Sequence, residues 1–155
     1  MTEDIRPAAD STALAVLNEL LEIVRDGEFG FQTCADEVAI PHLQRFFYHR
    51  AECFHEAADE LVRLIWRFGG TPAEGGTPPG FTPFKGAVIA RNDLSMLEEC
   101  ERREDAAIAR CRKALKQGDL PPEVRSFVER HAHDAERSND QLRDLRKTMR
   151  PDHAL

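Results

Sequence analysis

The stretch LAVLNELLEIVRDGEFGFQTCADEV, residues 14–38, decides the fold of this chain. One row of residues recurs through it at steps of three and four: Leu14, Leu17, Leu21, Val24, Glu28, Phe31, Ala35 and Val38. This spacing is typical of a helix that faces a packed partner. Glu28 stands where a core leucine is expected, and a buried carboxylate is costly unless it is paired, hydrogen-bonded or bound to a cation. The stretch therefore predicts a long core helix that carries a polar site.

Three further helical segments of similar length follow this one. The expected helices span about 11–38, 41–68, 84–116 and 121–149. Asp10 or Ser11 is expected to cap the first helix, and proline opens the second and the fourth. Glycines follow the second and third helices, which is typical of helix ends. Residues 71–83 are a Gly/Pro/Thr-rich stretch without a helical pattern and are expected to be a loop.

The connections between these helices are short, long and short, and this order bears on the topology. A helix of about 27 residues is about 40 Å long, and an extended loop over 71–83 spans that length. The sequence thus predicts an all-α, ferritin-like four-helix bundle with a long crossover between the second and third helices. A plain up-and-down bundle is the alternative. We expect a disordered N-terminus over 1–10, a single bundle domain over 11–150 and a C-terminal tail over 151–155.

Composition excludes several classes of function. The 155 residues are 41% hydrophobic and carry a net charge of -7, which disfavours binding to nucleic acid or to an anionic membrane. No apolar run approaches the roughly 20 residues that span a bilayer, and the N-terminus lacks a signal pattern. We expect a cytoplasmic protein whose four cysteines are free thiols.

Helix two contains Glu52-Cys53-Phe54-His55, a literal match to the Glu-x-x-His motif of ferritin-like di-iron sites. The geometry argues against that role. At about 100° per residue, Glu52 lies about 180° from Leu61, the centre of the apolar face, and His55 lies about 120° from it. We therefore expect the motif on the surface of the bundle or at a partner interface.

Five other polar residues are expected to point inward: Glu28, Arg50, Asp93, Glu104 and His131. In a ferritin-like topology Glu28, Arg50 and Asp93 fall within about one turn of each other, and Glu104 and His131 form a second level about two turns away. The favoured interpretation is a buried network that fixes helix register, with no metal and no other cofactor. The alternative is an iron or zinc site made by Glu28, Glu104 and His131, with Glu52 and His55 as a less favoured ligand pair. Arg50 opposes it, because a guanidinium cannot ligate a metal.

A second apolar row on the first helix bears on self-association. It comprises Val16, Leu20, Ile23, Gly27, Gly30 and Cys34. On the second helix, Tyr48, Val62 and Trp66 lie away from the core centre. Apolar surface beyond one broad sector marks an interface, so we expect a homodimer with an unknown protein partner in addition. The alternative is that the row packs on a neighbouring helix of the same bundle.

Several strings together resemble a bacterial family of ferritin-like four-helix-bundle proteins of unknown function. They are LNELLEIVRDGEFGF (17–31) with ADEV (35–38), RAECFHEAADEL (50–61), GGTP (69–72), LEECERRED (97–105), LPPEVR (120–125) and NDQLRDLR (139–146). Residues that match the family pattern are Glu28, Arg50, Cys53, Glu101, Glu104 and Asp105. The chain departs from it at His55, where a small residue is more usual, and at Ser138-Asn139-Asp140, where Asn-His-Asp is expected. The resemblance implies the bundle and a ferritin-like ancestry, and no established activity.

These observations lead to one functional expectation and one alternative. We expect a bundle without enzymatic activity of its own, acting as a stress-associated or interaction protein in the bacterial cytoplasm. The alternative is a metal-binding, ferritin-like oxidase or metal-storage protein.

Overall fold

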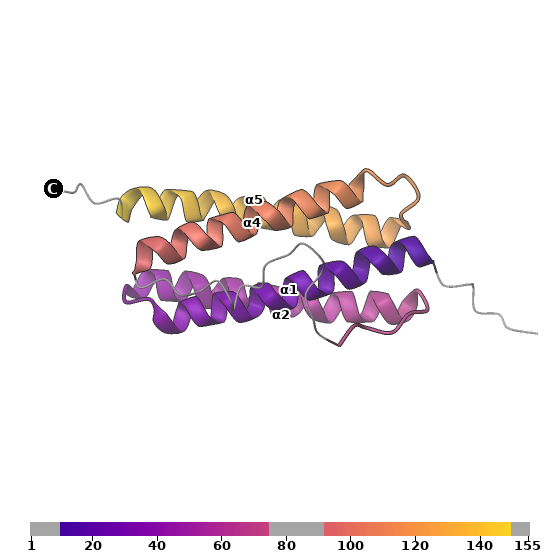
Figure 1. The fold of residues 1–155 in the computed structure, drawn as a ribbon, viewed down its shortest axis with the longest axis horizontal. Coiled ribbons are helices and arrows are strands. Elements are labelled where there is room, and N and C mark those ends of the chain that lie inside the picture. Colours follow the sequence, from indigo (N-terminus) through magenta and orange to yellow (C-terminus); the bar gives the residue numbers. More distant parts are fainter. Residues whose placement is uncertain (1–9, 75–91, 150–155) are drawn as a thin grey trace, which may run out of the picture.

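Four long helices make up this chain in a computed structural model that describes residues 10–74 and 92–149 (Figure 1). They are α1 (Ser11–Glu37), α2 (Pro41–Arg67), α4 (Asp93–Leu115) and α5 (Pro122–Met149). No strand occurs in these two ranges. None of the helices there is long and apolar enough to cross a membrane.

The helices form two hairpins that pack on each other. α1 packs mainly on α2, and α4 packs mainly on α5. The colours in Figure 1 show that α2 and α4 run in the same direction, opposite to α1 and α5. A chain can join two parallel helices only by a connection that returns along the bundle, so the ferritin-like crossover is confirmed and the plain up-and-down alternative is wrong.

Local chemistry explains where the helices begin and end. Asp10 caps α1 by accepting a hydrogen bond from the backbone N–H of Ala13 at 3.0 Å. α2 starts at Pro41, and Gly69, with a φ of 89°, turns the chain after its last residue. Asn92 caps α4 through the N–H of Ser95 at 2.8 Å, so α4 begins at Asp93 rather than near residue 84. The predicted turns over 84–91, most of the long loop and both termini lie outside the described residues.

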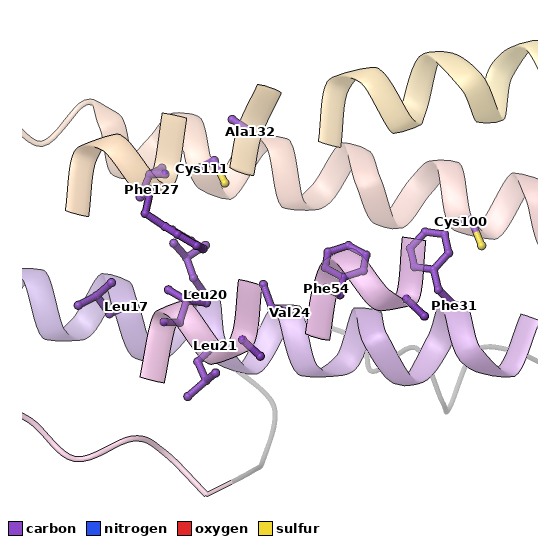
Figure 2. Close-up of a cluster of buried hydrophobic side chains, with 14 of the residues drawn as sticks. Leu17, Leu20, Leu21, Val24, Phe31, Phe54, Cys100, Cys111, Phe127 and Ala132 are labelled. Atoms are coloured by element: carbon purple, nitrogen blue, oxygen red, sulfur yellow. The ribbon is translucent and has the colours of Figure 1, made fainter. Parts of the chain in front are cut away.

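A continuous apolar core fills the space between the four helices, and Figure 2 shows part of it. Phe31 of α1 and Phe54 of α2 stack there with ring centroids 5.4 Å apart. Gly27 lets the two helices approach at this point, because a Cβ on it would lie 3.2 Å from the ring of Phe54.

The second apolar row of α1 lies inside this core. All six of its members, Val16, Leu20, Ile23, Gly27, Gly30 and Cys34, are buried within the single chain. The interpretation of this row as an interface is therefore wrong, since the row packs against neighbouring helices of the same bundle. Two buried rows give α1 a broad apolar sector whose edge, rather than its centre, carries Glu28.

Candidate functional site

The most distinctive polar group in the core is an ion pair between α2 and α4. Arg50 donates from Nε to Glu104 Oε2 at 2.7 Å and from Nη2 to Glu104 Oε1 at 3.1 Å. Both residues are buried, with 5% and 1% of their surface exposed. A two-pronged contact of this kind matches the planar fork of a guanidinium to both oxygens of a carboxylate and is among the strongest side-chain contacts in proteins.

A third helix completes this pair. Ser138 of α5 donates its hydroxyl hydrogen to Glu104 Oε2 at 2.6 Å and is itself buried. Glu104 thus accepts three hydrogen bonds from two other helices, which compensates the loss of water around its charge. Arg50, Glu104 and Ser138 are called the central triad below.

An aromatic ring lies against the central triad. The guanidinium of Arg50 lies over the ring of Phe54 at 4.4 Å, a cation–π contact. Burial lowers the pKa of Arg50, but attraction to Glu104 outweighs it, and the net shift is upward. Arg50 is therefore charged at pH 7.

His131 of α5 lies beside the central triad without joining it. Its imidazole stacks on Phe127 at 5.7 Å and meets Phe54 edge-on at 5.8 Å. Burial, with a smaller contribution from the charge of Arg50, lowers the pKa of His131 to about 4. The imidazole is therefore neutral at pH 7, and its buried Nε2 atom has no hydrogen-bond partner.

Glu28 and Asp93 do not belong to this network, so their predicted roles are wrong. Glu28 leaves 36% of its side chain exposed and contacts His55 at 3.0 Å between its Oε2 and Nδ1 of the histidine, on the outer face of α1 and α2. Asp93 is the first residue of α4, where its Oδ1 accepts from the backbone N–H of Ala39 at 3.3 Å.

The predicted heights along the bundle, which placed Glu104 about two turns from Arg50, are also wrong, and the start of α4 explains why. Arg50 is nine residues after the first residue of α2, and Glu104 is eleven residues after the first residue of α4. The two helices run in parallel, so these residues lie at nearly the same height and meet directly. A third helix that began near residue 84 would instead place Glu104 about two and a half turns further along.

The Glu-Cys-Phe-His segment lies on the surface except for Phe54. Glu52 and His55 are exposed, as its helical phase predicts. The hydrogen bond with Glu28 and the charges of Glu28 and Asp59 raise the pKa of His55 above its ordinary value. Nε2 of His55 lies 3.9 Å from Asp59 Oδ2, so two carboxylates flank this imidazole.

The donor chemistry of the core does not fit a metal ion. Both carboxylate oxygens of Glu104 already accept from the cation Arg50, and the third member of the group is a neutral hydroxyl. Within residues 10–74 and 92–149, no three histidine, cysteine or carboxylate side chains are grouped to hold a metal.

Sequence reasoning missed two polar contacts of α5. Ser138 lies one turn beyond Ala135 on the same inward-facing row of α5 as His131. This spacing indicates that Ser138 also faces the core, where it joins the central triad. Glu101 of α4 contacts both Arg143 and Arg146, and the hydrogen bond from Arg146 lowers its pKa.

The sequence profile of a family described as a domain of unknown function, DUF2383, matches residues 12–117. The chain belongs to this family. No curated protein sequence has significant similarity to this DUF2383 protein.

Solved structures share its fold at low sequence identity. Dps from Mycobacterium smegmatis, in a tetragonal crystal form, is 19% identical with a TM-score of 0.79, covering 94% of each chain. Dps from Thermosynechococcus elongatus is 14% identical with a TM-score of 0.76, covering 92% of this chain and 93% of its own. A dodecameric thioferritin from Bacteroides fragilis, described as bacterioferritin-related, is 15% identical with a TM-score of 0.74, covering 91% and 92%. The DUF2383 protein is therefore a ferritin-like bundle.

Proposed function

We propose that this DUF2383 protein is a non-enzymatic ferritin-like bundle that works by self-association and protein contact, as a stress-associated protein of the bacterial cytoplasm. The observation that carries this proposal is the central triad. A guanidinium offers no lone pair to a metal, and it holds both oxygens of the buried glutamate. A cation entering the core would have to displace Arg50 and leave its charge buried without a partner.

Metal analysis tests this proposal. The protein is purified from cells grown with added iron or with added zinc, and bound metal is measured per chain. We expect substoichiometric metal that does not change when Glu104 is replaced by glutamine. One or more metal ions per chain in the wild type, lost in Glu104→Gln, would contradict the proposal.

A metal-binding function at the outer face is the second candidate. The observation that favours it is the exposed imidazole of His55 at 3.0 Å from Glu28, since both are ligand types for iron or zinc. Because the described residues contain no group of three ligands, water would complete the coordination there. In the same analysis, this candidate requires stoichiometric metal that is lost in His55→Ala and retained in Glu104→Gln. His133→Ala, which removes an exposed histidine of α5, is the matched control.

The exposed aromatic residues of α1 and α2 support the proposal that this chain forms a homodimer. Phe29, Tyr48 and Trp66 are 50%, 41% and 59% exposed. Large aromatic side chains are enriched at protein interfaces, and the Bacteroides fragilis thioferritin with the same fold is dodecameric. We expect a net charge of -7 to keep nucleic acid and anionic membranes from being partners.

Light scattering at tens of micromolar tests this part. We expect a dimer or larger assembly in the wild type and a smaller mass in Phe29→Glu or Trp66→Glu. Ala106→Glu places the same charge on an exposed position of α4 and should leave the assembly intact. A wild-type monomer, or equal masses for all variants, would show that these exposed aromatic residues do not mediate self-association.

A further inference from the structure

Cys34 of α1 and Cys100 of α4 bring two thiols into contact inside the bundle. Their Sγ atoms are 3.6 Å apart, and both cysteines are free and fully buried. The sulfurs of a disulfide lie about 2.0 Å apart, so forming the bond requires these two atoms to approach by about 1.6 Å. The two residues are 66 positions apart in the sequence, so the fold makes this contact.

The other two cysteines have different surroundings. Cys53 is partly exposed on α2, where its sulfur lies 3.7 Å from Nε2 of His49. Cys111 lies about 16 Å beyond Cys100 along α4. Burial, with a smaller effect of Glu104, raises the pKa of Cys111 to about 12, so this thiol is unreactive in the folded bundle.

We propose that Cys34 and Cys100 are a latent disulfide site, oxidised by a hydroperoxide, whose bond ties the α1–α2 hairpin to the α4–α5 hairpin. One thiolate attacks an oxygen of hydrogen peroxide, an S–O bond forms, the O–O bond breaks, and the departing hydroxide takes up a proton as water. The second thiol then attacks the sulfenic sulfur, the S–S bond forms and the S–O bond breaks to release a second water. Two thiols are oxidised by two electrons, and one peroxide is reduced to two waters.

The position of the pair gives peroxide a route to it. Burial, together with the neighbouring Cys34 thiol, raises the pKa of Cys100 well above its usual value, which protects the pair in the closed bundle. Cys34 lies in the last turn of α1, which ends at Glu37. Opening of a helix end requires less free energy than opening of the whole bundle. Oxidation therefore proceeds through local opening, and low concentrations of urea should accelerate it.

The bond has a structural consequence because of where it lies. Packing is dense within each hairpin and sparser between α1 and α4. A covalent link at this contact closes a loop of more than 60 residues and restricts the unfolded chain. Oxidation thus stabilises the bundle against separation of its hairpins under peroxide stress.

A variant that retains only this pair gives the sharpest test. Cys53→Ala/Cys111→Ala leaves two of the four cysteines, and the full chain is treated with hydrogen peroxide under native conditions. We expect its intact mass to fall by about 2 Da and its thiols, titrated in denaturant, to fall from two to none. The midpoint of thermal unfolding should rise by about 5 °C or more, and dithiothreitol should reverse every change.

Peptide mapping of the oxidised wild type under non-reducing conditions identifies the partners. It should recover the Cys34 peptide joined to the Cys100 peptide, and adding Cys34→Ala to the double variant should abolish the loss of 2 Da. Two outcomes would overturn the proposal. One is two remaining thiols at a peroxide dose that oxidises Cys53 of the wild type, and the other is a bond that joins two chains or involves a different cysteine.

Discussion

The centre of the bundle and the outer face of α1 and α2 use the same kinds of residues in opposite surroundings. In the centre, Arg50 and Glu104 are at most 5% exposed and hold each other with two hydrogen bonds. On the outer face, Glu28 and His55 make a single contact with 36% and 62% of their side chains exposed. Water replaces a lost partner on the outer face and cannot do so in the centre. The comparison teaches that burial, rather than a match to a short motif, decides which polar residues hold this fold together.

Removal of the buried carboxylate should have the largest effect. Glu104→Ala leaves the charge of Arg50 in the core without its partner and should lower the free energy of unfolding by about 3–5 kcal/mol. Urea denaturation followed by circular dichroism measures it. Equal midpoints for Glu104→Ala and the wild type would show that Arg50 finds water in this position and that the centre does not differ from the surface.

His131 should make the stability depend on pH in a defined window. Its pKa is about 4 in the folded chain, against an ordinary value of 6.5, so the unfolded chain binds the extra proton between these values. Its contribution is therefore complete above pH 6.5 and is lost as the pH falls toward 4. Between pH 7 and 4.5 the wild type should lose about 2 kcal/mol more stability than His131→Phe. Parallel pH profiles for the two proteins would place the imidazole in contact with water.

Loss of the serine hydroxyl should cost less than loss of the charge. Ser138→Ala removes one of three hydrogen bonds to Glu104 and leaves the pairing with Arg50 intact. We expect a destabilisation of about 1–2 kcal/mol in urea denaturation. Ser126→Ala on the same helix, outside the triad, is the control. The same small change in both variants would mean that the hydroxyl adds nothing to the centre.

The outer face should be the least sensitive region. Glu28→Ala and His55→Ala should leave the urea midpoint at pH 8 nearly unchanged, because solvent screens this exposed contact. High salt should have little further effect on either variant. A loss comparable to that of Glu104→Ala would mean that Glu28 lies in the core and that the two regions are equivalent.

The fold was predictable because its signals are local and agree with one another. The apolar rows, the cap at Asp10, Pro41 and the glycines after α2 all indicate the same helices. The inward phase of Arg50, Glu104 and His131 was also readable, and the structure buries all three. The sequence did not show which of these inward-facing residues contact one another, since this depends on how far along the bundle each residue lies. The start of α4 at Asp93 rather than near residue 84 moves Glu104 along the bundle by about two and a half turns, and the breadth of the buried sector of α1 places Glu28 at its edge.

A combined substitution tests most directly whether the centre is a closed ion pair. Arg50→Met/Glu104→Leu replaces both charges with apolar side chains of similar size, and its unfolding in urea is compared with that of Glu104→Ala. We expect the double variant to retain most of the stability that the single variant loses, because no charge is left without a partner. A double variant that is as unstable as Glu104→Ala would contradict the pairing of Arg50 with Glu104.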